Sequence, residues 1–381
     1  MKPFAYISLL LLALFSLGIQ AQELVLQGRV VDAETGEPLP YVNIRAGEGK
    51  ATLTNIEGEF KFQVETEDLV TFSFIGYDKQ IIQADKVSDI IRLKPYATLL
   101  QEVTVLPIDE EDVLKRIIDN LKKDYKEKGK WTREYFFRAL IEEGEITYIA
   151  EAFMDAFSVV NVRYAEIVSG LQGYDKEAGK GRLILNSSNI HKLIEVGPMT
   201  IKSNLWSGVE KPLQHFSYSK EYFARKLDHL IGEDGESLYR IEFSLKEKYN
   251  VAFSDKPYIT GTAYVDAKTC RLLRFDGSCH NCKARMGLMS YSTSIDFHME
   301  YDYSKGAASV LNMAIQGCNA FMNYRALLFA IEEDKQDADK TKASGSNIVT
   351  ALEQAGYDGS LWSKYDIIKR TKEEERVAFG K

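Results

Sequence analysis

The stretch from Gly28 to Leu93 constrains the fold of this chain most, because apolar residues recur in it at every second position. Phe60, Phe62 and Val64 fall on one face of an extended segment, and the polar residues between them fall on the other. This alternation predicts a half-buried strand. The same alternation occurs in Val70, Phe72 and Phe74. Several short strands of this kind in fewer than about a hundred residues predict a β-sandwich.

Turn sequences separate these predicted strands. One is Thr35-Gly36-Glu37-Pro38 and another is Asn55-Ile56-Glu57-Gly58. Glycine supplies the positive φ angles and proline the fixed φ angle that tight turns require. The glycines of this stretch are therefore interpreted as residues that the turns require for their backbone conformation.

Four motifs of this stretch resemble the carboxypeptidase-like regulatory domain. In order, they are Gly28-Arg29-Val30-Val31-Asp32, Thr35-Gly36-Glu37-Pro38-Leu39-Pro40-Tyr41-Val42-Asn43-Ile44, Thr54-x-x-x-Gly58-Glu59-Phe60 and Ser73-Phe74-Ile75-Gly76-Tyr77. The resemblance implies a small transthyretin-like β-sandwich over residues 22–106. Such domains follow carboxypeptidase catalytic domains and, in Gram-negative envelopes, precede the plugs of TonB-dependent transporters.

The remainder of the chain matches neither of these two contexts. A transporter would need a plug and a large barrel, which 381 residues cannot hold. A zinc carboxypeptidase of that family would need a His-x-x-Glu pair, but His191 is followed by Glu195, one residue too late. We therefore expect no enzymatic activity, no catalytic residues and no cofactor.

The N-terminus has the features of a secretory signal peptide over residues 1–21. A lysine near the start precedes an apolar run from Ile7 to Leu17, and the small residue Ala21 stands before Gln22. The apolar run is shorter than the roughly 20 residues that span a bilayer. We expect an exported protein, periplasmic or associated with the outer membrane, with no transmembrane segment after removal of the signal.

The net charge of -8 indicates which partners to expect. Binding to a nucleic-acid backbone requires clustered lysine and arginine. Nucleic acid is therefore not expected as a partner. Envelope proteins, glycans and lipids remain as candidate partners.

A helical period begins after Pro107. Val113, Ile117 and Leu121 recur in steps of four, and acidic residues precede them, where negative charge favours the helix dipole. This pattern predicts a linking α-helix within residues 107–130, with its apolar stripe packed on the domain that follows.

Residues 131–334 predict a larger curved antiparallel β-sheet domain with one covered face. Hairpin turns are expected at Glu143-Gly144, at Asp266 to Thr269 and at Ser304-Lys305-Gly306. Residues 335–381 are interpreted as a charged linker and a C-terminal tail, in which Thr371 and Glu374 have the spacing of a capping box. The fold class is therefore mainly β.

Cys279-His280-Asn281-Cys282 is the most suggestive short motif, because two cysteines at this spacing can form a disulfide, bind a metal or perform redox chemistry. The motif is expected in a loop flanked by glycine and serine. With Cys270 and Cys318, the four cysteines allow three disulfide pairings. Structural disulfides or unpaired thiols are favoured over a metal site and over redox catalysis.

Asp296, His298 and Glu300 alternate along one predicted strand and therefore share a face. Their side chains could bind a divalent metal ion. The solvated face of an amphipathic strand explains the same three residues without an ion and is the favoured interpretation.

The sequence thus predicts a non-enzymatic cell-envelope protein for binding or assembly. The sandwich would act as a docking or spacing module, and the second domain would hold a protein partner, a glycan or a lipid. One alternative is a metal-dependent hydrolase with Asp296, His298 and Glu300, and another is a thiol oxidoreductase with Cys279 and Cys282. A third is a periplasmic lipid carrier, which requires a continuous apolar cavity.

Overall fold

The computed structural model describes residues 23–47, 49–98, 110–126, 131–175, 196–197, 200–202, 206–210, 221–286, 289–319, 322–331, 335–336, 347–364 and 368–380. The predicted signal peptide and the predicted domain boundary at Leu106-Pro107 lie outside these residues. Within them, no helix has the length and apolar character needed to span a membrane.

Two small sheets form the N-terminal part of the chain. One has the strand order β4-β1-β7 and the other β3-β2-β5-β6. The strands are β1 (Glu23–Asp32), β2 (Asn43–Ala46), β3 (Lys50–Leu53), β4 (Glu59–Glu65), β5 (Leu69–Ser73), β6 (Gln80–Gln83) and β7 (Ile90–Leu93), with the 3₁₀ turn η1 (Ala84–Lys86). Phe60, Phe62 and Phe72 are fully buried in the common core. The predicted sandwich is therefore confirmed.

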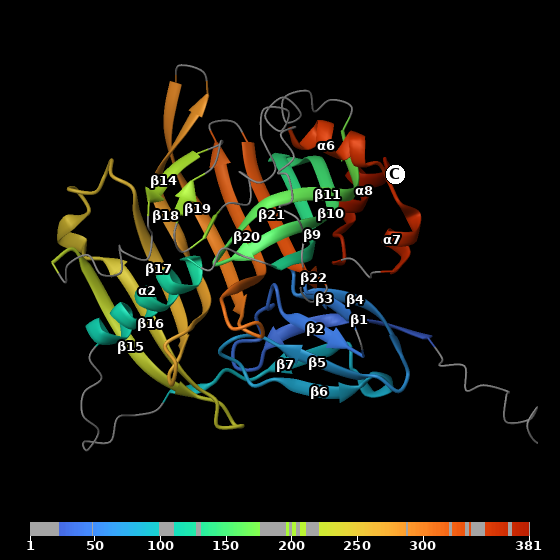
Figure 1. Cartoon of the computed structure of the whole chain (residues 1–381), viewed down its shortest axis with the longest axis horizontal. Helices are drawn as coiled ribbons and strands as arrows, with labels where there is room; N and C mark the ends of the chain where they lie inside the picture. The colour runs from blue at the N-terminus through green and yellow to red at the C-terminus, as the bar shows by residue number, and fades with distance from the viewer. Residues whose placement is uncertain are drawn as a thin grey trace, which may run out of the picture.

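A large antiparallel sheet forms most of the rest of the chain (Figure 1). Its main path has the order β11-β10-β9-β21-β20-β19-β18-β17-β16-β15-β8, so that neighbours in sequence are mostly neighbours in the sheet. The strands are β8 (Ala97–Thr98), β9 (Trp131–Glu143), β10 (Glu145–Val159), β11 (Asn161–Tyr174), β15 (Phe223–Ile231), β16 (Ser237–Leu245), β17 (Tyr258–Asp266), β18 (Leu272–Met286), β19 (Met289–Asp302), β20 (Ser309–Asn319) and β21 (Met322–Ala330). The three predicted hairpins are confirmed as β9–β10, β17–β18 and β19–β20.

Short elements extend this sheet. They are β12 (Val196–Gly197), β13 (Thr200–Lys202), β14 (Trp206–Glu210) and β22 (Lys335–Gln336), with the 3₁₀ turn η2 (Glu247–Tyr249). β14 pairs with β18, and β22 pairs with β9. Most of the predicted charged linker up to residue 346 lies outside the described residues.

The predicted linking helix is present as α2 (Glu110–Lys126). Its apolar stripe, including Val113, Ile117 and Leu121, belongs to the same core as the large sheet. Asn120 donates hydrogen bonds to the carbonyl oxygens of Thr269 and Cys270, so the helix is also fixed at the turn between β17 and β18. The prediction that α2 packs on the second domain is confirmed.

The C-terminal segment differs from the predicted tail. It forms α6 (Ile348–Ala355), α7 (Gly359–Lys364) and α8 (Lys372–Phe379), which lie beside β10 and β11 (Figure 1). Trp362 is buried against Phe136 and Phe153 of the sheet. These apolar contacts join residues that are about two hundred positions apart in the sequence, so the local pattern did not predict them. The predicted capping box of Thr371 and Glu374 is confirmed at the start of α8.

Gly173 of β11 permits the close approach of α8. A Cβ atom added there would lie 2.3 Å from the carbonyl oxygen of Val377 and 2.7 Å from Cα of Ala378. We expect Gly173→Ala to lower the free energy of unfolding by about 1–3 kcal/mol, because the helix must move away. Gly317→Ala in β20 is the control, since its nearest neighbour would be a side-chain atom of Ile295 at 3.4 Å. Equal effects of the two substitutions in urea denaturation would contradict this packing argument.

The sandwich lies directly against the large sheet (Figure 1), and polar side chains join the two parts. Asn43 donates to Glu300 at 2.6 Å, and Tyr96 donates to Glu236 at 2.9 Å. Lys369, which precedes α8, donates to Glu59 of β4 at 2.6 Å. The sandwich therefore contacts both the sheet and the C-terminal segment.

Candidate functional site

A pocket of about 240 Å³ lies where the sandwich, the large sheet and the C-terminal segment meet; we call it the junction pocket. The sandwich contributes Tyr41, Asn55 and Ile56 to its wall. Strands β9, β19, β20 and β21 contribute the largest share, and the C-terminal segment contributes Ile368 and Glu374. The pocket is thus assembled from segments that are far apart in the sequence.

Tyr41 has an unusual backbone conformation at this pocket. Its φ angle is 63°, in the left-handed region that residues other than glycine rarely adopt. Burial raises the pKa of Tyr41 to about 12, while the nearby Arg325 lowers it and Glu374 raises it. Since strained residues are concentrated at binding sites, this conformation marks the pocket as a candidate site.

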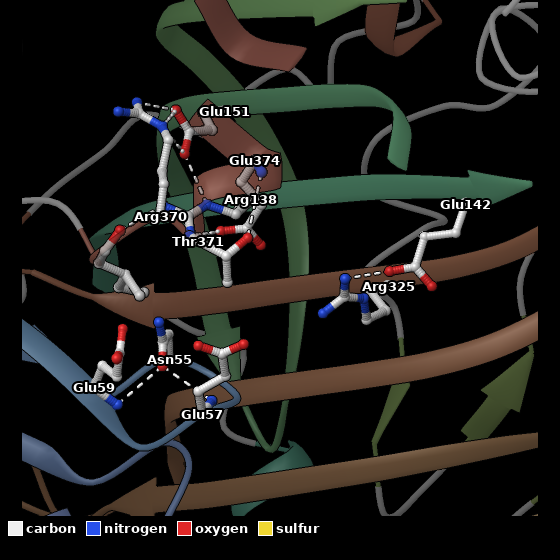
Figure 2. Close-up of polar contacts among 11 residues, drawn as sticks. Asn55, Glu57, Glu59, Arg138, Glu142, Glu151, Arg325, Arg370, Thr371 and Glu374 are labelled. Carbon is white, nitrogen blue, oxygen red and sulfur yellow. Dashed lines mark hydrogen bonds and ion pairs between the residues drawn. The ribbon is translucent and has the colours of Figure 1, made fainter. Parts of the chain in front are cut away.

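Three buried side-chain nitrogens in the pocket wall have no hydrogen-bond partner among the described residues. They are Nε of Arg325, Nδ2 of Asn55 and Nε2 of His298, of which the first two are N–H donors. Arg325 also donates to Glu142 through Nη2, and Oδ1 of Asn55 accepts from the backbone amides of Glu57 and Glu59 (Figure 2). A buried donor without an acceptor costs about 1–3 kcal/mol.

Arg138 of β9 closes the pocket beside the C-terminal segment (Figure 2). Its Nε donates to Glu151 at 2.7 Å, its Nη1 to Glu374 at 3.3 Å and its Nη2 to the carbonyl oxygen of Ile368 at 2.5 Å. Arg138 is almost fully buried, and these three acceptors occupy each of its nitrogen atoms. Its role is therefore to hold the wall together.

Glu151 of β10 lies at the centre of this network and is fully buried. It also accepts hydrogen bonds from Arg370, whose Nε is 3.1 Å from both carboxylate oxygens. Glu374 accepts from the backbone amide of Thr371 at 2.8 Å, which completes the capping box of α8. One set of charge-assisted bonds thus fixes the C-terminal segment and shapes the pocket wall.

The three residues considered as metal ligands do not form one ligand set. Asp296 and His298 line the junction pocket, whereas Glu300 lies deeper, between the sheet and the sandwich. Each has a protein partner: Asp296 accepts from Ser278, His298 contacts Asp276, and Glu300 accepts from Asn43 and Asn312. Among the described residues, no three or more His, Cys, Asp or Glu side chains are grouped as metal ligands would be.

The interpretation of a solvated strand face is wrong for two of these residues. His298 is 8% exposed and Glu300 is 1% exposed, whereas Asp296 is exposed. The reason is the sandwich, which covers this part of β19: the rings of Tyr41 and Phe74 stack on the His298 ring at 5.2 Å and 5.8 Å between centroids. Sequence periodicity could not show that another domain packs there.

Arg274 of β18 joins the sheet to the sandwich beside His298. Its Nη1 donates to the carbonyl oxygen of Ile75 at 2.8 Å, and its guanidinium lies 3.9 Å from the centre of the Phe74 ring. Its Nε donates to Asp276 at 2.6 Å. Burial raises the pKa of Asp276, but the charges of Arg274 and His298 and their hydrogen bonds outweigh burial and hold this pKa below its usual value.

The cysteine motif lies inside strand β18, and the prediction of a loop is wrong. Cys279 and Cys282 are fully buried, and in this structure no disulfide joins any two of the four cysteines, all of which are described. The hydrogen bond with Cys279, followed by burial, raises the pKa of Cys282. A nucleophilic thiol needs the opposite, a lowered pKa and access to substrate, so this geometry is unsuited to a thiol oxidoreductase.

A second hollow lies beside α2 and has a volume of about 430 Å³. Leu114 and Ile118 are its apolar residues. The other residues of its wall are charged: Glu111, Lys115, Asp119, Lys122 and Arg225. A lipid carrier would instead present a continuous apolar wall.

The sequence contained one signal for this site that was not used. Arg138 and Glu151 are single charges within the apolar runs Tyr135–Ile141 and Ile146–Met154. A charge at such a position must be paired when the strand is buried. The partners Arg370 and Glu374, however, are more than two hundred residues away from Arg138 or Glu151.

Comparison with known proteins identifies the N-terminal part of the chain. The family described as CarboxypepD_reg-like domain matches residues 26–105. The TonB-dependent receptor SusC of Bacteroides thetaiotaomicron is 33% identical over 87 residues, which are 23% of this chain and 8% of the receptor. The chain therefore spans only a small part of this curated relative. The family resemblance of the four sequence motifs is confirmed, and residues 26–105 are a carboxypeptidase regulatory-like domain.

Proposed function

We propose that this protein is a non-enzymatic binding protein of the Gram-negative cell envelope, which holds a small polar ligand in the junction pocket. Two findings support the location: the regulatory-like domain and the similarity of the same region to a TonB-dependent receptor. The pocket supports the binding role, because the sandwich and the sheet each contribute part of its wall.

The unpaired donors of the pocket are the observation that carries this proposal. Arg325 and Asn55 each have a buried N–H group without an acceptor among the described residues, and the side chain of Tyr41 lies near Arg325. A ligand oxygen that reached these nitrogens would remove the cost of leaving them unpaired. The ligand should therefore carry carboxylate, carbonyl or hydroxyl oxygens.

The size of the pocket limits the ligand further. Its volume of about 240 Å³ lies below the range of about 300–1,000 Å³ that is typical of drug-sized ligands. Arg138, Arg325, Asp296 and Glu374 give it charged walls. A small polar molecule fits this site better than a lipid chain. The sandwich then acts as part of the binding site in addition to being a docking module.

Native mass spectrometry of the protein recovered from its own envelope tests this function. We expect a small additional mass that is lost on denaturation. Tyr41→Phe removes only the hydroxyl group, and Arg325→Gln removes the charged donor; both should weaken the affinity for the ligand at least tenfold, which corresponds to about 1.4 kcal/mol, and so lower the bound fraction.

Tyr96→Phe is the matched control, because Tyr96 also joins the sandwich to the sheet but bonds to Glu236 outside the junction pocket. This variant should retain the ligand. A wild-type chain without additional mass would argue against the ligand site, and a bound mass that survives both pocket substitutions would place the ligand elsewhere.

A further inference from the structure

Cys279 and Cys282 are brought to the same face of β18 by a bulge. Residues at i and i+3 of a regular strand point to opposite faces. Here the pairing with β19 changes from Cys279 opposite Ile295 to Cys282 opposite Thr293, so that two residues of β18 face one of β19. Asn281, inside the bulge, has a φ angle of 55°. As a result, both cysteines point into the core and are fully buried.

The two sulfur atoms lie next to each other. Sγ of Cys282 is 2.8 Å from Sγ of Cys279 and 3.4 Å from the carbonyl oxygen of Cys279. A disulfide bond is about 2.05 Å long, so closure requires the sulfurs to approach by less than about 1 Å. We propose that Cys279 and Cys282 form an intrachain disulfide in the protein as it exists in the envelope.

The other two cysteines have different surroundings. Cys318 is exposed and its Sγ lies 2.8 Å from Oγ1 of Thr293. Cys270 is buried at the turn before β18, where its carbonyl oxygen accepts from Asn120 of α2. The geometry therefore selects one bond, between Cys279 and Cys282, and leaves Cys270 and Cys318 as thiols.

The oxidation transfers two electrons. The two S–H bonds break, one S–S bond forms, and two electrons and two protons pass to a disulfide-containing oxidase, which is reduced to its dithiol. Envelope compartments supply oxidants of this class. The attacking group must be a thiolate, and burial and the hydrogen bond with Cys279 raise the pKa of Cys282 in the folded chain. The bond therefore forms before or during the burial of β18.

The bond would hold the bulge in place. Within the bulge, the His280 ring stacks on Tyr258 at 4.7 Å and contacts Thr260 at 2.8 Å. Nδ2 of Asn281 donates to the carbonyl oxygen of Phe253 at 2.7 Å. The bulge therefore positions the segment between β16 and β17, and a covalent ring of four residues fixes this arrangement.

Alkylation under denaturing conditions tests the proposal on the full chain recovered from the envelope. Without reductant, we expect iodoacetamide to label Cys270 and Cys318 only, and a peptide containing Cys279 and Cys282 to have two hydrogens fewer than its reduced form. After reduction, all four cysteines should be labelled. Cys318→Ser should leave the linked peptide unchanged, whereas Cys282→Ser should make Cys279 available for labelling. Labelling of all four cysteines without reductant, or a linked peptide that contains Cys318, would overturn the proposal.

Discussion

Glu151→Ala is expected to lower the free energy of unfolding by about 3–5 kcal/mol, because it removes one member of a buried ion-pair network. Glu151 is fully buried and accepts hydrogen bonds from both Arg138 and Arg370. Without it, two guanidinium groups face each other with a single carboxylate, that of Glu374, beside them. We also expect the C-terminal segment to detach from the sheet in this variant.

Urea denaturation and limited proteolysis would measure this effect. In addition to the lower stability, cleavage should begin within residues 368–380 before the sheet unfolds. Glu145→Ala is the matched control, because Glu145 is also on β10 and pairs with an arginine, Arg376, but its side chain is 80% exposed. Exposed ion pairs contribute little, so the control should be nearly neutral. If both substitutions had the same small effect, the network would not hold the C-terminal segment.

Arg274→Ala is expected to have a similarly large effect, about 3–5 kcal/mol, at the contact between the sandwich and the sheet. Arg274 donates to Asp276 and to the carbonyl oxygen of Ile75, and it stacks on Phe74. Its removal leaves the partly buried Asp276 carboxylate with the His298 ring as its remaining hydrogen-bond partner among the described side chains. The pKa of Asp276, which Arg274 holds down, should rise accordingly.

We expect Arg274→Ala to uncouple the unfolding of the sandwich from the unfolding of the large sheet. Calorimetry should show a separate unfolding transition of the sandwich in this variant, whereas we expect a single transition for the wild type. Arg271→Ala is the control: Arg271 stacks on Tyr303 at 4.7 Å and donates to the carbonyl oxygen of Gly306, and both of these partners belong to the large sheet or its turns. If Arg274→Ala unfolded in a single transition with the stability of the wild type, other contacts would be sufficient to hold the sandwich on the sheet.

Both substitutions also bear on the proposed ligand site. Glu151 fixes the wall of the junction pocket through Arg138, and Arg274 fixes the sandwich that supplies Tyr41. If Glu151→Ala or Arg274→Ala no longer binds the ligand, the cause would be a disordered pocket wall. If Tyr41→Phe no longer binds it, the cause would be the missing hydroxyl group. Comparing ligand binding with stability in the same variants separates the two causes.

Local periodicity was sufficient for most of the strands. Alternation in Glu59–Glu65 and turns such as Glu143-Gly144 predicted elements that the structure contains. It failed at Cys279 to Cys282, because a bulge with a left-handed residue interrupts the alternation inside a strand. It also failed after residue 347, where three helices are held by contacts with strands that are distant in the sequence, β10 and β11 among them.

The sequence by itself determined the family of residues 26–105, the mainly β fold class and the position of the linking helix. These features depend on turn residues and on the spacing of neighbouring side chains, which a single segment contains. The tertiary structure alone decided that His298 and Glu300 are buried, that Glu151 meets Arg370, and that Tyr41 lines a pocket with Glu374. Which face of a strand is covered depends on where distant segments pack, and periodicity within the strand carries no information about them.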